Sequence, residues 1–112
     1  MLSGMAEYML IMTAVGDESE AERLAREIAG ARLAAAVQII GPVRSFYWWK
    51  GDLVDAREWQ VQIKTTKERL GDIAAHIRAN HSYETPGILA LKIEAGSREY
   101  LDWISAETGT GA

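Results

Sequence analysis

The most constraining feature of this chain is a set of short segments that are apolar at consecutive positions. Residues 8–15 read YMLIMTAV, residues 34–40 read AAAVQII, and residues 88–91 read ILAL. Successive side chains of a β-strand point to opposite faces of its sheet, so these segments predict strands that are apolar on both faces. Both faces of the resulting sheet then need a cover.

Two segments between these strands follow the helical period instead. Capping boxes, in which a hydroxyl and a carboxylate three residues apart satisfy backbone N–H groups, are predicted at Ser19 with Glu22 and at Thr65 with Glu68. The apolar stripes that follow them are Ala21, Leu24, Ala25, Ile28 and Ala29, and Leu70, Ile73, Ala74 and Ile77. Ser97 predicts the start of a last, short helix.

Strict alternation marks one further strand at residues 58–65. Its apolar set is Trp59, Val61, Ile63 and Thr65, and its polar set is Glu58, Gln60, Gln62 and Lys64. This pattern predicts a half-buried strand. The aromatic segment 43–49 precedes it, and Lys50-Gly51-Asp52 predicts the chain reversal between the two.

The order strand, helix, strand, strand, helix, strand predicts an α+β, ferredoxin-like βαββαβ sandwich with an extra C-terminal helix. We expect a single domain over residues 7–107, with residues 1–6 and 108–112 as flexible termini. Helices cover only one face of such a sheet. Copies of the same chain, arranged with closed symmetry, would cover the other apolar face.

Composition removes several classes of function. Sixteen acidic against twelve basic residues give a formal charge of −4, so we expect no nucleic-acid partner. The chain has no cysteine, which excludes disulfides, thiolate metal sites and catalytic thiols. The longest apolar run is too short to cross a bilayer, so we expect no membrane partner and a cytoplasmic location.

Three segments together resemble the CutA family, the divalent-cation tolerance proteins. They are RLAAAVQIIGPVRSFYWWKGDL at residues 32–53, EWQVQIKT at residues 58–65 and NHSYETPGILAL at residues 80–91. The similarity extends from about residue 12 to residue 104. It implies a ferredoxin-like homotrimer packed through its sheets, with a role in tolerance to copper and other divalent metals.

Two positions depart from the usual pattern of that family. Ala36 stands where a cysteine is common, which excludes thiolate binding of a soft metal. Ser82 stands where a proline is usual, which predicts a looser loop around His81.

The loop histidine gives the predicted metal site. His81 supplies an imidazole nitrogen, and Glu84 and Glu58 supply oxygen atoms, so this incomplete shell predicts weak binding of Cu(II) or another divalent cation, with no organic cofactor. The alternative is purely structural. In that interpretation His81 ends a helix, and Pro86 forces an extended entry into the next strand.

A cleft between neighbouring chains is the second predicted site. The residues placed there are Tyr47, Trp49, Lys64, Tyr83 and Trp59, together with the two glutamates of the metal site. The alternative is that these residues form structural interface contacts.

No enzyme is predicted. The loop GDESE at residues 16–20 would repel a phosphate, and no nucleophile–histidine–acid pattern is present in the sequence. The remaining alternative to metal tolerance is a trimeric small-molecule sensor or signalling protein with its ligand held between subunits.

Overall fold

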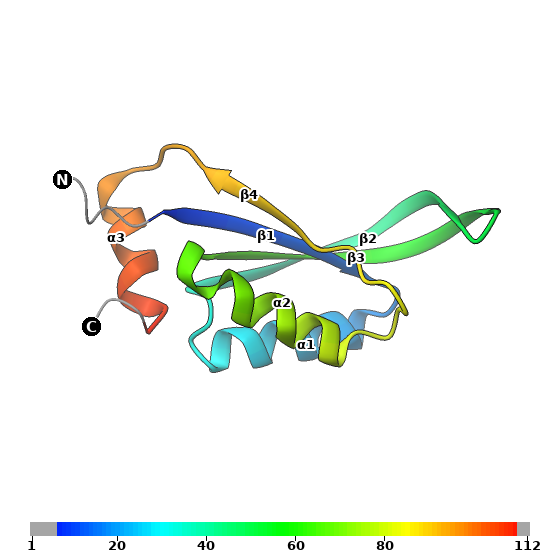
Figure 1. Ribbon diagram of the computed structural model, residues 1–112, viewed down its shortest axis with the longest axis horizontal. Helices are drawn as coiled ribbons and strands as arrows, with labels where there is room; N and C mark the ends of the chain where they lie inside the picture. Colours follow the sequence, from blue (N-terminus) through cyan, green and yellow to red (C-terminus); the bar gives the residue numbers. More distant parts are fainter. Residues whose placement is uncertain (1–6, 110–112) are drawn as a thin grey trace.

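The computed structural model describes residues 7–109 as two layers, a four-stranded antiparallel sheet and a pair of helices packed on one of its faces (Figure 1). The strands are β1 (Tyr8–Val15), β2 (Ala36–Trp49), β3 (Asp52–Thr66) and β4 (Leu89–Ile93), in the order β2-β3-β1-β4. The helices are α1 (Glu18–Gly30), the 3₁₀ turn η1 (Lys67–Arg69), α2 (Leu70–Asn80) and α3 (Arg98–Glu107). This arrangement confirms the predicted βαββαβ order with a C-terminal helix.

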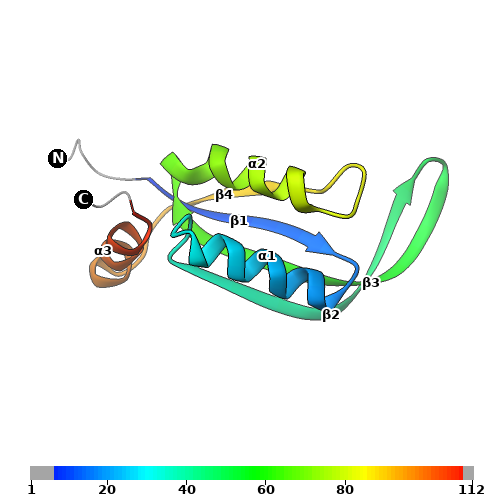
Figure 2. The same cartoon turned by 90° about the horizontal axis from the view of Figure 1, so that it is seen from below.

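The core lies between the sheet and helices α1 and α2, which run side by side beneath it (Figure 2). The side chains with no exposed surface include Ile11, Val15, Leu24, Ile28, Val61, Ile63, Ile73 and Ile77. Each contributes about 1.5–3 kcal/mol through burial of its apolar surface. Along β1, burial alternates strictly, so one face of this strand is covered and the other is only half-buried.

Residues 58–65 form part of β3, and their apolar side chains face the core as the alternating pattern predicted. Val61, Ile63 and Thr65 are buried on the helix-covered face, and Trp59 packs against the same core. Glu58 and the polar residues that alternate with this set lie on the other face. That face is where the functional site has to be sought.

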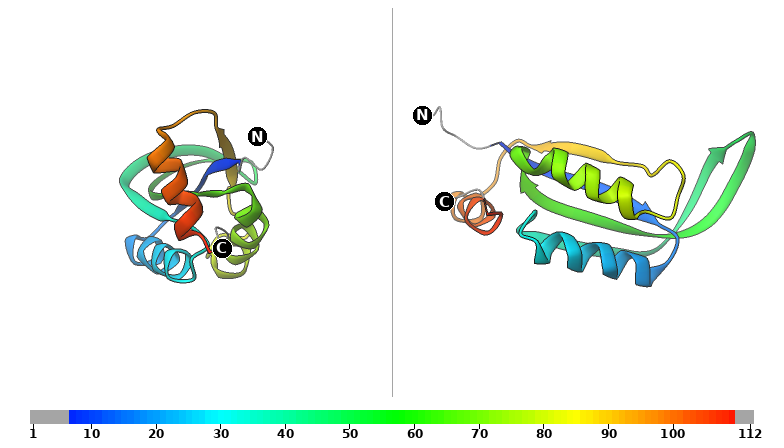
Figure 3. Two further views of the ribbon diagram at one scale, coloured as in Figure 1. Left: turned by 90° about the vertical axis from the view of Figure 1, so that its left-hand side faces the viewer. Right: turned by 60° about the horizontal axis from the view of Figure 1, so that its bottom comes forward.

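The two apolar segments 34–40 and 43–49 belong to one long strand. The register between β2 and β3 shifts between Ile40 and Val43, so Gly41 and Pro42 form an irregularity rather than a break. The reversal at Lys50 and Gly51 is confirmed, and both residues have positive φ angles of 50° and 87°. The hairpin projects beyond the end of the sheet, opposite α3 (Figure 3).

The helix starts correct two predictions. Asp17, not Ser19, caps α1. Its Oδ1 accepts hydrogen bonds of 2.9 Å from both the backbone N–H and the hydroxyl of Ser19. The bond from the backbone N–H is the main cause that lowers the pKa of Asp17. Thr65 does not cap the second helix, because its hydroxyl donates to the carbonyl of Leu33 at 2.6 Å and β3 continues to Thr66. The predicted Ser97 cap is confirmed by its bond from the Tyr100 backbone.

The sheet face away from the helices carries many exposed apolar side chains. Leu89 and Leu91 of β4 are 63% and 52% exposed, and Trp49 on the hairpin is 39% exposed. Their exposure agrees with the sequence argument that one face of the sheet lacks a cover within the chain. Among residues 7–109, no helix is long and apolar enough to cross a membrane.

The close approach of Gly41 to Trp59 gives a test of this packing. A Cβ atom at Gly41 would lie 2.6 Å from Trp59 Cδ1 and 3.0 Å from its Cα, so Gly41→Ala should lower the free energy of unfolding by about 1–3 kcal/mol. Urea unfolding followed by tryptophan fluorescence at one protein concentration measures the change.

Gly71→Ala is the matched control for that substitution. Gly71 lies within α2, and a Cβ atom added to it would have no neighbouring atom within 4 Å, so alanine there should raise the free energy of unfolding by up to about 1 kcal/mol. An unfolding midpoint of Gly41→Ala at or above that of the wild type would contradict the close packing of Gly41 on Trp59.

Candidate functional site

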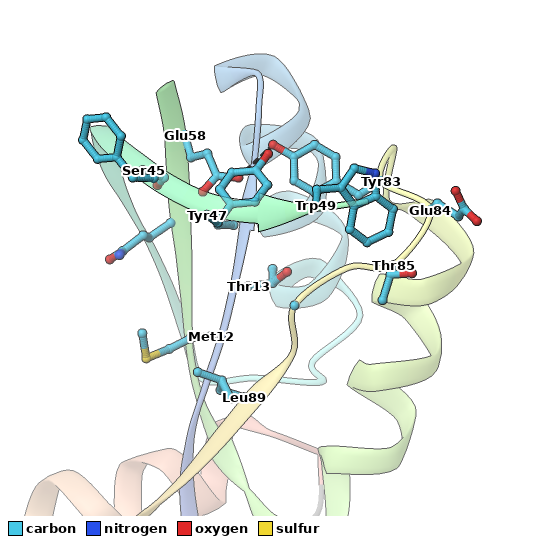
Figure 4. Close-up of a pocket in the computed structure, with 14 residues that line it drawn as sticks. Met12, Thr13, Ser45, Tyr47, Trp49, Glu58, Tyr83, Glu84, Thr85 and Leu89 are labelled. Atoms are coloured by element: carbon cyan, nitrogen blue, oxygen red, sulfur yellow. Dashed lines mark hydrogen bonds between the residues drawn. The ribbon is translucent and has the colours of Figure 1, made fainter. Parts of the chain in front are cut away.

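A cavity of about 630 Å³ opens on the uncovered face of the sheet, at the base of the hairpin (Figure 4). Its lining comes from all four strands and from the loop between α2 and β4. Alternation along the strands turns Glu58 and Gln60 of β3 toward it, together with Tyr47 and Trp49 of β2. Tyr83 closes it from the loop side.

Buried Glu58 and half-buried Tyr83 form the polar centre of the cavity. The Tyr83 hydroxyl donates to Glu58 Oε2 at 2.8 Å, and Glu58 is only 8% exposed. Burial, followed by this hydrogen bond, the nearby carboxylate charge and the Tyr47 hydroxyl, raises the pKa of Tyr83 far above its usual range. Tyr83 is therefore a neutral hydrogen-bond donor at any physiological pH.

Gly16 makes room for the tyrosine. A Cβ atom at this position would lie 3.1 Å from the Tyr83 hydroxyl, so a larger residue would push the ring away from Glu58. The sequence indicated Gly16 only as the first residue of the loop GDESE. Its second role depends on a residue 67 positions away and has no local signal.

His81 fastens the loop that carries Tyr83. Its side chain is completely buried, its Nε2 donates to the Ala14 carbonyl at 2.7 Å, and its Nδ1 accepts the Tyr83 backbone N–H at 3.0 Å. These two bonds require a neutral imidazole with the proton on Nε2. Both ring nitrogens are thus engaged in holding β1 to the loop.

Ser82 strengthens this loop rather than loosening it. Both its backbone N–H and its hydroxyl donate to the carboxylate of Glu20 on α1, each at 2.8 Å. The prediction that the absence of a proline leaves the loop loose is therefore wrong. No local pattern indicated a role for Glu20, because the contact joins residues 62 positions apart.

The mouth of the cavity carries an exposed ion pair. Lys50 Nζ lies 3.1 Å from Glu84 Oε1 and 5.4 Å from the centre of the Trp49 ring. Two side chains of the hairpin thereby meet the loop after α2. Lys50 was missed as a functional residue, although its position next to Trp49 at the reversal was a usable signal.

The structure brings together five of the residues predicted for the two sites. These five line the cavity: Tyr47, Trp49, Glu58, Tyr83 and Glu84. Three others lie elsewhere. His81 is buried in its loop contacts, Lys64 donates to the Tyr100 hydroxyl at 3.2 Å, and Trp59 packs on the core side of the sheet.

The three predicted metal ligands do not form a ready-made shell. Within residues 7–109, no group of three or more His, Asp or Glu side chains is placed to hold a metal ion. Glu58 and Glu84 present oxygen atoms to the cavity, whereas His81 could bind a metal only after giving up a hydrogen bond. The metal site stays a prediction.

Comparison with solved structures supports the fold. A structure described as the periplasmic divalent cation tolerance protein CutA from Archaeoglobus fulgidus superposes with a TM-score of 0.87 at 38% identity, covering 90% of this chain and 98% of that one. CutA1 from Oryza sativa gives a TM-score of 0.87 at 33% identity, covering 90% and 93% of the two chains. The described residues therefore adopt the same fold as these proteins.

Comparison with curated sequences and family profiles identifies the family. The divalent-cation tolerance protein CutA of Archaeoglobus fulgidus is 44% identical over 85 residues, which are 76% of this chain and 82% of that protein. The protein of the same name from Thermus thermophilus is 38% identical over 94% of this chain and its own full length. The profile described as CutA1 divalent ion tolerance protein matches residues 9–107. This chain belongs to the CutA1 divalent ion tolerance protein family.

Proposed function

We propose that this protein acts in tolerance to copper and other divalent metal ions as a homotrimer that binds the ion weakly and catalyses no reaction. The observation that carries the proposal is the apolar, uncovered sheet face, which also bears the cavity. Family membership supplies the link to divalent cations. We further propose a cytoplasmic location, although one relative is described as periplasmic.

The uncovered face supports assembly through the sheets. The exposed leucines of β4 and exposed Trp49 of the hairpin contribute apolar surface to this face, which water would otherwise contact. The hairpin extends a molecule whose longest dimension is 49 Å, so its tip is well placed to reach a neighbouring chain. Closed threefold symmetry would cover all three such faces at once.

A charge placed on that face tests the assembly. Leu91→Glu should convert a particle of three times 12.4 kDa into a folded monomer, because a carboxylate would have to be buried between sheets. Ala75→Glu, on the exposed side of α2, adds the same charge outside the proposed interface and should leave the trimer intact. Sedimentation velocity with circular dichroism measures both. A folded wild-type monomer at micromolar concentration would refute the proposal.

The donor atoms around the loop support weak rather than tight metal binding. Cu(II) accepts imidazole nitrogen and carboxylate oxygen, and the chain has no cysteine to offer a thiolate. Glu58 and Glu84 line the cavity, but His81 would lose a hydrogen bond of 2.7 or 3.0 Å on binding. The lost bond reduces the net free energy gained from the ion.

The two histidines provide matched variants for a metal titration. His81→Ala should weaken Cu(II) binding about tenfold or more, because it removes the only nitrogen ligand proposed. His76→Ala should have no effect, since His76 contacts Glu27 at 2.9 Å on the helical layer. Isothermal titration calorimetry measures the affinities.

A third variant separates ligand loss from damage to the loop. Glu84 is 71% exposed on its side chain, so Glu84→Gln should weaken Cu(II) binding without changing thermal stability. Unchanged Cu(II) affinity in both His81→Ala and Glu84→Gln would exclude the metal site in this loop.

The size of the cavity favours one alternative function, a small-molecule sensor. Its volume of about 630 Å³ lies within the range of ligand pockets, roughly 300–1,000 Å³. In this alternative the protein is a trimeric signalling protein, and the ligand is held between the cavity of one chain and its neighbour. Binding of a small molecule at stoichiometry three per trimer would favour it over metal tolerance.

A further inference from the structure

The buried carboxylate of Glu58 has no positively charged partner among residues 7–109. The side chain that it contacts is Tyr83, through a neutral hydroxyl. Among the described residues, no Lys, Arg or His nitrogen lies within 4.0 Å of its oxygen atoms. A carboxylate that is 8% exposed and unpaired by charge is costly to bury, so a cation is the ligand that would gain most from this site.

Aromatic rings form the walls around this carboxylate. Tyr47 and Tyr83 lie beside Glu58 in the close-up view, Trp49 lies beyond them toward Glu84, and apolar Met12 and Leu89 lie farther along the cavity (Figure 4). The faces of aromatic rings attract ammonium and guanidinium groups. They do not ligate inorganic cations, which prefer oxygen, nitrogen or sulfur donors. The walls therefore favour an organic cation over a metal ion.

The mouth of the cavity already shows this chemistry within the chain. The ammonium group of Lys50 lies 5.4 Å from the centre of the Trp49 ring and 3.1 Å from Glu84. A ring face and a carboxylate thus hold one ammonium group at the rim. Deeper in the cavity, the same two kinds of group occur with no ammonium of the described residues between them.

We propose that the cavity binds a small organic ammonium ion with an apolar body. Glu58 pairs with the ammonium group, the Tyr47 ring lies beside it, and the apolar body lies toward Met12 and Leu89. A volume of about 630 Å³ exceeds what the end of one lysine side chain from a second copy would fill. This inference rests on the proposed function in one respect, that the cavity remains open in the proposed trimer.

Three probes with the same phenyl-ethyl body test the charge requirement. Phenethylammonium, neutral 2-phenylethanol and anionic 3-phenylpropionate are titrated into the purified full chain in buffer containing a metal chelator. The ammonium probe should bind at least about tenfold more tightly than the alcohol, and the anion should not bind. Equal affinity for the ammonium and alcohol probes, or no ammonium binding, would overturn the proposal.

One isosteric substitution tests the residue. Glu58→Gln keeps an oxygen that accepts from Tyr83 but removes the charge, so it should weaken phenethylammonium binding about tenfold or more and leave 2-phenylethanol binding unchanged. Glu68→Gln removes an exposed carboxylate outside the cavity and should change neither. Unchanged ammonium affinity in Glu58→Gln would overturn the proposal.

Measurements on the same samples separate this inference from the proposed function. Sedimentation without ligand reports the trimer, and Cu(II) titration of His81→Ala in chelator-free buffer reports the metal site. A trimer that binds Cu(II) but not phenethylammonium would overturn only the inference, with a lysine of the neighbouring copy as the occupant. A monomer that binds phenethylammonium would overturn only the assembly.

Discussion

The structure depends on one constraint, that two helices can cover only one face of a four-stranded sheet. On the covered face, β1 and β3 bury a continuous set of isoleucine and valine side chains against α1 and α2. The other face of the sheet is left available for assembly and for ligand binding. The exposed leucines, the aromatic hairpin and the cavity around Glu58 all lie on or beside it. Assembly and ligand binding are consequently tied to a single surface.

The loop between α2 and β4 connects the two faces. His81 bonds to β1 and to the loop backbone, and Ser82 bonds to Glu20 on α1, so the helical layer fixes where Tyr83 meets Glu58. His81 therefore acts on the cavity by holding Tyr83 in position, through two hydrogen bonds of a neutral imidazole. This explains how a histidine beside a candidate ligand site can be fully buried.

The sequence predicts the periodic part of this architecture and misses the part made by long-range contacts. The alternation around Val61 and Ile63 correctly separated a core face from a polar face, because that pattern depends only on neighbouring residues. Asp17, rather than Ser19, caps α1, since aspartate and serine are both favoured caps and the local pattern does not choose between them. Glu20 and Gly16 contribute through partners 62 and 67 positions away, which no local pattern reports.

The raised pKa of Tyr83 sets the electrostatic character of the cavity. Because the hydroxyl keeps its proton beyond the usual range of tyrosine, it donates to Glu58 across all physiological pH values and never adds a second negative charge there. The associated stability is present below the ordinary tyrosine pKa of about 10 and is lost as pH rises above it toward the raised value. A cavity that joins the buried Glu58 side chain to a neutral tyrosine hydroxyl thus favours positive charge through the same contact that holds its loop in place.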